Sequence, residues 1–408
     1  MGKKVSVWIS VFIALLLCVA TYLVTATAIN SAYREEIASL RANQTSGQDV
    51  SSNEDMYSKL RDIEDLVNQV FVGDINRDEL TDAVCSAYLA ALGDKYTMYH
   101  TSEEMKEYLS DSEGSYVGIG VQASFDTATG GIYVITVFPD SPAAEAGILV
   151  GDIIVQANDV VCTSETYYKT INTIRGEEGT EVDLVIKRGD KTFDLTVARA
   201  KVDAVSVAYS MPEKGVALIR INQFSQTTPD DFRAALESAS EDKAEYYVFD
   251  MRNNGGGNLG AIVEVLDMLL PEGTILTYSD KDGNIIGSYS STDKESLDAP
   301  MAVLINGNTA SAAELFTAAL RDYEKAVTVG TTTYGKGEMQ SLYTLDDGSG
   351  VRISTYYYNP PCGVNYEGIG ITPDIEFEMP EELAERFYQL TPEEDVQLQA
   401  AITAVKQQ

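Results

Sequence analysis

Residues 301–340 read MAVLINGNTASAAELFTAALRDYEKAVTVGTTTYGKGEMQ. The apolar run Met301–Asn306 predicts a buried strand, and the segment Ala310–Leu320 predicts a helix, because its apolar residues recur at helical spacing. Further strands are expected at Ala326–Gly330 and, earlier in the chain, at Val216–Ile221. The same alternation of strands and helices runs through the sequence after Ala200, which predicts an α/β core.

Ser311 falls in the first turn of the expected helix, where unpaired backbone N–H groups and the helix dipole favour negative charge. That position suits a nucleophilic oxygen. His100 is the only histidine, lies far away in the sequence and is expected to be a surface or packing residue. A serine nucleophile would then need another base, and lysine is the known alternative. Lys336 stands between two glycines, and Gln340, four residues later, can reach its ammonium group.

Taken alone, a serine in the first turn of a helix is usually a cap, and Gly-Lys-Gly is usually an exposed turn. The joint spacing is more specific, and it consists of Thr309–Glu314, Gly330, Thr333, Gly335–Gly337 and Gln340. This pattern resembles the carboxyl-terminal processing proteases, serine peptidases with a Ser–Lys pair and an orienting glutamine. The resemblance implies Ser311 as the nucleophile, Lys336 as the general base and Gln340 as the residue that positions the lysine.

The composition limits the classes of partner. The chain has 408 residues, enough for two or three domains. Its formal net charge of −34 and pI near 4.2 make nucleic acids and anionic lipid surfaces unexpected ligands. The four cysteines, at positions 18, 85, 162 and 362, have the spacing of neither a metal site nor a disulfide scaffold. We therefore expect no metal and no cofactor.

Residues Val5–Ile29 are almost all apolar or small and follow Lys3 and Lys4. About 20 apolar residues span a bilayer, and the flanking basic residues place the N-terminus in the cytoplasm. A cleaved signal peptide is the rival reading, since Ala26-Thr27-Ala28 resembles a cleavage site. The length of the run favours an uncleaved anchor, so residues 1–30 are expected to hold the protein in the cell membrane as a single-pass protein with its catalytic domains on the extracytoplasmic side.

Residues 31–55 are expected to form a linker and residues 56–112 a helical region. An apolar stripe from Met56 to Phe71 predicts one amphipathic helix. A second helix is expected to begin at the N-cap Asn76 and to end at Gly93. The amphipathic helices at 56–92 and a further helical segment at 381–405 could support a homodimer or pack on the core, and the sequence favours neither.

Residues 113–200 read as a β-rich domain. Ser141–Gly147 has the signature of a short helix, with an N-capping serine, a proline and a terminal glycine. The order of these features resembles a PDZ domain, which implies that backbone N–H groups hold the C-terminal carboxylate of a peptide beside an edge strand. The residues expected to contact the peptide are Gly118, Ile119, Gly120, Val121 and Tyr167.

A buried strand runs into Arg252–Gly260, which contains three consecutive glycines. Such a loop can be a flexible turn, cradle a phosphate or form an oxyanion hole. No Gly-Lys-Ser/Thr follows, which argues against a phosphate loop. The segment resembles Asp-x-Arg-x-Asn-x-Gly-Gly of the same protease family, with Gly255 where many members have proline. The resemblance implies oxyanion donors at Gly256, Gly257 and Ala312.

The predicted fold is therefore multidomain α/β, with an α/β serine-protease core over residues 201–380 and an inserted β-rich PDZ domain. N-terminal helices, a single N-terminal transmembrane helix and a C-terminal helical segment over residues 381–408 complete it. Tyr366–Ile375 also resembles a stretch near the end of the catalytic core of the protease family.

The predicted function is an extracytoplasmic serine endopeptidase that captures proteins or peptides by their free C-termini and forms an acyl-enzyme. The Lys336 pKa must then fall from ~10.4 to ~7–8. One alternative is a non-catalytic PDZ scaffold with a degenerate core, although Ser311 and Lys336 are both present. Another is a hydrolase of small amides or esters, against which the PDZ domain argues.

Overall fold

The computed structural model describes residues 50–126, 129–292 and 296–408. The apolar segment Val5–Ile29, expected to be a membrane anchor, and most of the expected linker lie outside these residues. Among the helices that are described, none is both long and apolar enough to cross a bilayer. The chain divides into two compact units, Met1–Leu80 and Thr81–Gln408, which we describe separately.

Helix α2 (Val50–Val70) makes up most of what is described of the first unit. It begins inside the segment expected to be a linker, because a polar, solvent-facing helical turn has the same composition as a linker. Apolar side chains of α2, among them Leu60, Ile63 and Leu66, are exposed. The expected second helix is α3 (Arg77–Ala90), and the Asn76 side chain caps it by accepting hydrogen bonds from the next turn.

The β-rich domain is part of the second unit, and its described residues form strands and two helices. Its sheet has the order β3-β4-β5-β7-β8, with β6 paired to β5, so β3 is an edge strand. The elements are β2 (Ser115–Gly118), β3 (Val121–Asp126), β4 (Gly131–Val137), α5 (Pro142–Glu145), β5 (Ile153–Ala157), β6 (Val160–Val161), α6 (Tyr167–Ile174), β7 (Glu181–Arg188), β8 (Lys191–Ala198) and β9 (Ala200–Asp203). The expected helix after Ser141 is present, and the Ser141 hydroxyl caps it by accepting from the Ala144 N–H at 3.2 Å.

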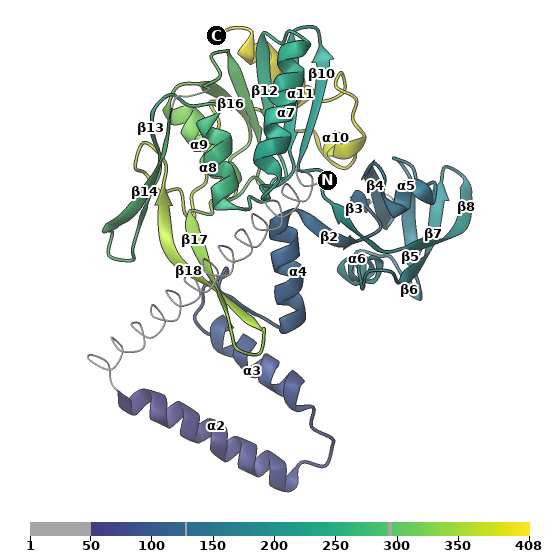
Figure 1. Cartoon of the computed structure of the whole chain (residues 1–408), viewed down its shortest axis with the longest axis vertical. Helices are drawn as coiled ribbons and strands as arrows, with labels where there is room; N and C mark the ends of the chain where they lie inside the picture. The colour runs from purple at the N-terminus through teal and green to yellow at the C-terminus, as the bar shows by residue number, and fades with distance from the viewer. Residues whose placement is uncertain (1–49, 127–128, 293–295) are drawn as a thin grey trace, which may run out of the picture. The chain divides into compact units, whose positions relative to one another are not determined.

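The core is a six-stranded sheet with the order β10-β11-β12-β15-β16-β19 (Figure 1). All neighbours run parallel except β10 and β11. The strands are β10 (Val207–Glu213), β11 (Val216–Ile221), β12 (Tyr246–Asp250), β15 (Met301–Ile305), β16 (Ala326–Gly330) and β19 (Ile375–Glu376). The expected α/β core is therefore confirmed, and β11 and β16 have the bounds that the sequence predicted.

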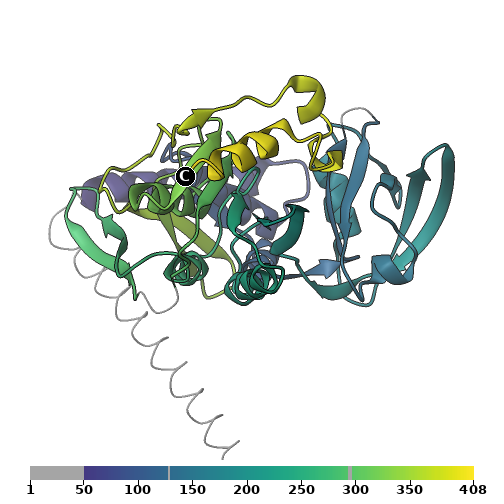
Figure 2. The ribbon, with the colours of Figure 1, turned by 90° about the horizontal axis from the view of Figure 1, so that it is seen from above.

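The strand order explains where the helices lie. Each crossover steps to the next strand in the same direction, and crossovers between parallel strands are right-handed, so their helices belong on one face. These helices are α7 (Thr228–Glu241), α8 (Leu259–Asp267) and α9 (Ala312–Asp322), which pack with Ile219, Phe249 and Val303 in one apolar cluster. The opposite face, including Val248 and Leu304, is covered by α11 (Val396–Val405) (Figure 2).

A second sheet, whose strands the sequence analysis did not predict, has the order β1-β18-β13-β14, with β17 also paired to β18. Its strands are β1 (Met98–His100), β13 (Gly273–Ser279), β14 (Ile285–Ser291), β17 (Glu338–Thr344) and β18 (Gly350–Asn359), and helix α4 (Ser102–Glu113) follows β1. The chain passes directly from the Lys336 loop into β17, so this sheet supports one side of the candidate site.

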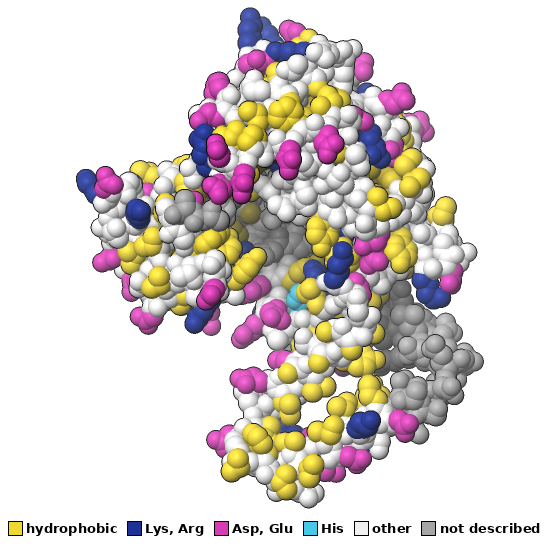
Figure 3. Space-filling model, turned by 180° about the vertical axis from the view of Figure 1, so that it is seen from behind, with side chains coloured by type: hydrophobic (Ala, Val, Ile, Leu, Met, Phe, Trp, Pro, Cys, Tyr) yellow, Lys and Arg dark blue, Asp and Glu magenta, His cyan; other side chains and the backbone are white. Residues whose placement is uncertain are grey.

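The C-terminal segment is helical only in part. It contains α10 (Glu381–Ala384), a single 3-10 turn at Phe387–Gln389 and α11, with non-helical residues between them. Acidic side chains outnumber basic ones over the face drawn in Figure 3, in line with the net charge of −34 of the whole chain.

Candidate active site

The proposed nucleophile lies at the carboxyl end of a central parallel strand. Ser311 follows β15 and is the N-cap of α9, with φ 58° and ψ −119°. A positive φ is rare for a residue with a side chain and costs on the order of 1–3 kcal/mol, so the surrounding contacts must hold it. The Ser311 side chain is buried, with 6% of its surface exposed.

The glycine loop meets the nucleophile because β12 and β15 are neighbours whose carboxyl ends share one edge of the sheet. The Ala310 N–H donates to the carbonyl oxygen of Asn254 at 2.9 Å. Gly256 lies so close that a Cβ there would stand 2.8 Å from the Ser311 Cβ, which explains a glycine at this position.

The N–H groups of this loop are not equivalent. The Gly256 N–H donates to the Asn254 side-chain oxygen at 2.8 Å, so it is already occupied. Gly257 is exposed, and the residues on either side of it bond to Phe224: the Phe224 N–H donates to the Gly256 carbonyl oxygen at 2.9 Å, and the Asn258 N–H donates to the Phe224 carbonyl oxygen at 2.7 Å. Ala312 is the first residue of α9, where the N–H has no partner within the helix. Of the three expected oxyanion donors, Gly257 and Ala312 therefore suit the role better than Gly256.

A buried ionic network anchors the start of the glycine loop, and the sequence analysis did not identify it. Asp250 and Arg252 are both buried and form an ion pair at 2.8 Å, and Arg252 also pairs with Asp395 at 2.7 Å. Although burial disfavours its charge, the guanidinium groups of Arg252 and Arg220 hold the Asp250 pKa well below its usual range. Removing one partner would leave a buried charge uncompensated.

Glu314 joins the nucleophile loop to the lysine loop, and it is fully buried. One carboxylate oxygen accepts from the Ser311 N–H at 2.8 Å and from the Lys336 N–H at 2.8 Å. The other accepts from the Thr333 hydroxyl at 2.5 Å and from the Gly335 N–H at 2.7 Å. One side chain thus fixes the backbone on both sides of the proposed catalytic pair.

The family motif at Tyr366–Ile375 supports the lysine loop from its other side. The Gly368 N–H donates to the Gly335 carbonyl at 3.0 Å, and the Gly337 N–H donates to the Glu367 carboxylate at 2.7 Å. A Cβ on Gly335 would stand 2.8 Å from the Gly370 nitrogen. The glycines on both segments allow this close backbone contact.

Lys336 has the electrostatic setting of a base. Burial, followed by the positive charge of Arg352, lowers the Lys336 pKa to about 8. Its ammonium nitrogen lies 4.7 Å from the centre of the Tyr96 ring. Within the part of the chain that the structure describes, no hydrogen bond joins this nitrogen to the Ser311 hydroxyl.

Gln340 does not contact Lys336 in this arrangement. Its side-chain amide donates to the Glu338 carbonyl at 3.1 Å and to the Ser354 hydroxyl at 3.2 Å. The pairing of β17 with β18 shifts register between Met339 and Gln340, and such a bulge reorients the side chains that follow it. The simple i, i+4 relation expected from the sequence does not take this shift into account.

The Ser311 hydroxyl instead contacts a residue that the sequence analysis missed. Its Oγ lies 3.0 Å from the hydroxyl oxygen of Tyr358, on β18. Tyr358 is one of three consecutive tyrosines in a strand, a pattern that does not distinguish a core residue from a site residue.

His100 packs on Tyr108, with ring centres 5.4 Å apart, and lies on β1. Its Nε2 has no hydrogen-bond partner among the described residues. Burial is the main reason that its pKa is lowered. This placement agrees with the expectation of a packing histidine.

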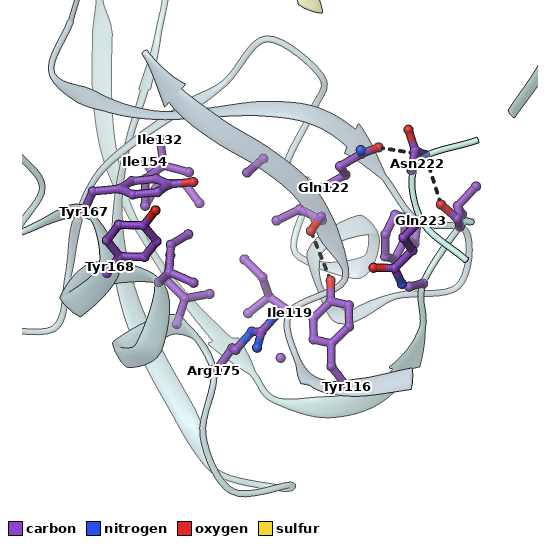
Figure 4. Close-up of a pocket in the computed structure, with 18 residues that line it drawn as sticks. Tyr116, Ile119, Gln122, Ile132, Ile154, Tyr167, Tyr168, Arg175, Asn222 and Gln223 are labelled. Carbon is purple, nitrogen blue, oxygen red and sulfur yellow. Dashed lines mark hydrogen bonds between the residues drawn. The ribbon is translucent and has the colours of Figure 1, made fainter. Parts of the chain in front are cut away.

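The β-rich domain has a groove between β3 and α6, and the expected peptide-contacting residues Gly118, Ile119, Val121 and Tyr167 line it. Gly120 lies in the same loop and has φ 83°. Figure 4 shows Arg175 beside Tyr116 at one end of the groove and Tyr167 with Tyr168 at the other. The Arg175 guanidinium lies 5.3 Å from the centre of the Tyr116 ring. The sequence analysis did not identify Arg175, which brings a positive charge to an otherwise mostly apolar groove.

Comparison with known proteins agrees with this architecture. Residues 215–377 match peptidase family S41, and residues 115–198 match a PDZ domain. The chain is 31% identical to a CtpA-like serine protease of Staphylococcus aureus (strain MRSA252) over 374 residues, which cover 90% of this chain and 73% of the relative. It is also 31% identical to a carboxy-terminal-processing protease of Bartonella bacilliformis over 330 residues, covering 79% and 75% of the two chains.

A solved S41 protease structure from Bacteroides fragilis has the same fold, with a TM-score of 0.57 and 19% identity over 79% of this chain and 90% of that one. The fold prediction of a mixed α/β protease with a PDZ domain is thus confirmed, apart from the N-terminal membrane segment, which lies outside the described residues. Identity of this extent over most of two relatives shows that the chain belongs to the carboxy-terminal-processing family of S41 serine peptidases.

Proposed function

We propose that this serine peptidase captures the C-terminus of a protein in its PDZ groove and cleaves the chain by a Ser–Lys mechanism. The observation that carries the proposal is the Glu314 carboxylate, which accepts hydrogen bonds from the backbone of both Ser311 and Lys336. One buried side chain therefore holds two loops that are far apart in the sequence.

In this scheme the Ser311 Oγ attacks the scissile carbonyl carbon while its proton passes to the neutral Lys336 Nζ. The C–N bond then breaks, and the Lys336 ammonium gives its proton to the departing amine. An acyl ester remains on Ser311. Lys336 next takes a proton from water, which attacks the ester, and the C–Oγ bond breaks as the proton returns to Ser311.

Lys336 suits the role of base because its pKa of about 8 leaves a usable neutral fraction near pH 7. Its ammonium group lies on the Tyr96 ring, so the flexible side chain must turn toward Ser311 before reaction. Catalytic hydrogen bonds are often incomplete until substrate is bound. Gln340 would orient the lysine in that reacting arrangement.

The developing oxyanion would be held by the N–H groups of Gly257 and Ala312. The first belongs to the glycine loop, and the second starts α9, where the helix dipole also favours negative charge. The buried ion pairs of Arg252 with Asp250 and Asp395 fix the first residues of the glycine loop.

Capture would use the groove beside β3. The outer edge of β3 has no partner strand within the sheet and offers backbone groups to an extended peptide. The turn Gly118–Gly120 would present N–H groups to the terminal carboxylate, and Arg175 would add positive charge. Apolar side chains such as Ile119 and Tyr167 would receive the last residues of the peptide.

The same proposal places the peptidase outside the cytoplasm, anchored by Val5–Ile29, since Lys3 and Lys4 precede this apolar run. The exposed apolar side chains of α2 are compatible with a homodimer.

The test uses the full chain and a matched pair of peptides with an apolar C-terminus, one a free acid and one an amide. Amidation removes the terminal charge but leaves the scissile bond unchanged. We expect the acid to have a clearly lower KM. The Ser311→Ala variant should lose roughly three orders of magnitude or more in kcat on both peptides.

Two results would contradict parts of the proposal separately. Equal kinetics for acid and amide would mean that the groove does not read a free C-terminus. Cleavage by Ser311→Ala at a tenth of the wild-type rate would mean that the nucleophile is assigned wrongly, and would leave room for the alternative of a scaffold with a degenerate core. Nothing in the comparisons favours that alternative, because the matched relatives are named as proteases.

A further inference from the structure

We propose that Tyr358 is a further catalytic residue, whose hydroxyl donates a hydrogen bond to the Ser311 Oγ and thereby directs the serine proton toward Lys336. The inference rests on the proposed role of Ser311 as nucleophile. Its basis is the 3.0 Å separation of the two hydroxyl oxygens, both in buried side chains with 6% and 7% of their surfaces exposed.

The direction of this hydrogen bond follows from the chemistry. Geometry alone allows either oxygen to donate. If Ser311 donated to Tyr358, its proton would point away from any base, and the Oγ would be a poor nucleophile. If Tyr358 donates, the serine proton is free to face Lys336. The phenol is the stronger acid of the two, which also favours Tyr358 as the donor.

Burial keeps the phenol in the state that this role needs. Burial is the main cause that raises the Tyr358 pKa to about 12, so the hydroxyl holds its proton throughout the neutral range. Tyr358 therefore acts only as a hydrogen-bond donor. During acylation the proton of Ser311 goes to Lys336, while Tyr358 keeps its own proton and stabilises the charge that develops on Oγ.

The position of Tyr358 is coupled to the lysine loop by the backbone. The Tyr358 N–H donates to the carbonyl oxygen of Gly337 at 2.9 Å, and Gly337 directly follows Lys336. The Asn365 side-chain amide donates to the carbonyl oxygens of both Gly337 and Tyr358. Hydrogen bonds to the backbone thus connect Tyr358, the proposed donor to Oγ, with the loop that carries the proposed base Lys336.

The same hydroxyl supplies an advantage in deacylation. As the C–Oγ bond breaks, negative charge develops on the serine oxygen while Lys336 returns the proton to it. A donor already aimed at that oxygen lowers the cost of this charge without any rearrangement. A single fixed hydroxyl would then assist both chemical steps.

The test is Tyr358→Phe in the full chain, which removes only the hydroxyl and keeps the ring in the core. The expected result is a fall in kcat of roughly 10- to 100-fold, the range for a hydrogen bond to a developing charge, with KM unchanged. Labelling of Ser311 by a fluorophosphonate, which forms a P–Oγ bond and releases fluoride, should slow to a similar degree. The rise of activity with pH should stay near pH 8, because Lys336 is not altered.

The matched control is Tyr278→Phe. Tyr278 lies on β13, directly opposite Tyr358 in the pairing with β18, and packs on the same apolar cluster without touching Ser311. We expect wild-type kcat and wild-type labelling from this control. A Tyr358→Phe variant that equals or exceeds wild type, or that moves the pH dependence, would overturn the proposal.

The labelling experiment separates this inference from the proposed function. If the fluorophosphonate modifies Ser311 in the wild type and reacts equally fast with Tyr358→Phe, only the role of Tyr358 is wrong. If Ser311 in the wild type is not modified at all, the nucleophile is misassigned and the inference falls with it.

Discussion

The two sides of the candidate site are built differently. The nucleophile side belongs to the parallel sheet, where Ser311 and the glycine loop follow adjacent strands and the Ala310 N–H, just before Ser311, donates to the Asn254 carbonyl oxygen. The base side belongs to the junction with the second sheet, where Lys336 precedes β17. The residues of the nucleophile side already contact one another. On the base side, the Lys336 ammonium lies on the Tyr96 ring and does not contact Ser311, and the Gln340 amide bonds to Glu338 and Ser354 and does not contact Lys336.

The two sides differ in where their side chains lie, and not in how firmly their backbones are held. The Glu314 carboxylate positions the backbone of both sides equally well, since it bonds to Ser311 and to Lys336. A long lysine side chain has several rotatable bonds beyond that fixed point. We therefore expect the nucleophile side to be preorganised and the base side to be completed by movement of one side chain.

The largest effect is expected from Lys336→Arg. Arginine keeps the positive charge but cannot lose a proton near neutral pH, so kcat should fall as far as in Lys336→Ala, by roughly three orders of magnitude.

In the wild type the base is active when neutral, so kcat/KM should rise about tenfold per pH unit and level off above the Lys336 pKa of about 8. Steady-state kinetics between about pH 6 and pH 10, which span roughly two units on either side of that pKa, measure the loss of kcat and the pH dependence.

Lys95→Arg is the matched control for this variant. The Lys95 ammonium lies 4.7 Å from the centre of the same Tyr96 ring, but its side chain is 54% exposed. Near-wild-type activity is expected. An active Lys336→Arg enzyme would remove the distinction between the two sides, because Lys336 would then serve only as a fixed charge.

A smaller effect is expected from Glu314→Gln. Glutamine replaces one carboxylate oxygen with an NH2 group, which cannot accept a hydrogen bond from these donors. Depending on which oxygen is replaced, the acceptor is lost either by the N–H groups of Ser311 and Lys336 or by the Thr333 hydroxyl and the Gly335 N–H. We expect kcat to fall roughly 10- to 100-fold with little change in KM, and the free energy of unfolding to drop by about 1–3 kcal/mol. Kinetics and thermal unfolding measure these two changes.

Glu314→Asp sharpens the result, because it keeps the charge but shortens the reach by one methylene. If charge alone mattered, the aspartate variant would retain wild-type kcat. An unchanged kcat in Glu314→Gln would show that the two loops hold their places without this carboxylate, and that the two sides of the site are independent.

The smallest effect is expected from Gln340→Ala. Its amide contacts Glu338 and Ser354, and the base remains when it is lost, so kcat should fall less than about tenfold. Ser354→Ala, which removes one of these contacts but keeps the amide, should have a still weaker effect. A loss of two orders of magnitude with a shifted pH dependence would instead mean that Gln340 holds Lys336 in the reacting state.

Much of the fold was predictable because its signals are local. Mostly apolar runs identify the buried strands of a parallel sheet, and β11 and β16 were predicted at their observed bounds. The second sheet was missed because β13, β14 and β18 are rich in serine, threonine and tyrosine and mix polar with apolar residues on both faces. Their pairing is between segments far apart in the chain, which periodicity does not report.

The sequence by itself determined the family, the order of its domains and the residue types of the proposed catalytic pair, because these depend on motifs read along the chain. Only the tertiary structure decided which groups contact them. The Glu314 connection, the bulge beside Gln340 and the Tyr358 hydroxyl on Ser311 each join segments at least 14 residues apart or depend on the register between strands. Such contacts arise when sheets and loops pack together, and no local pattern in a single sequence encodes their geometry.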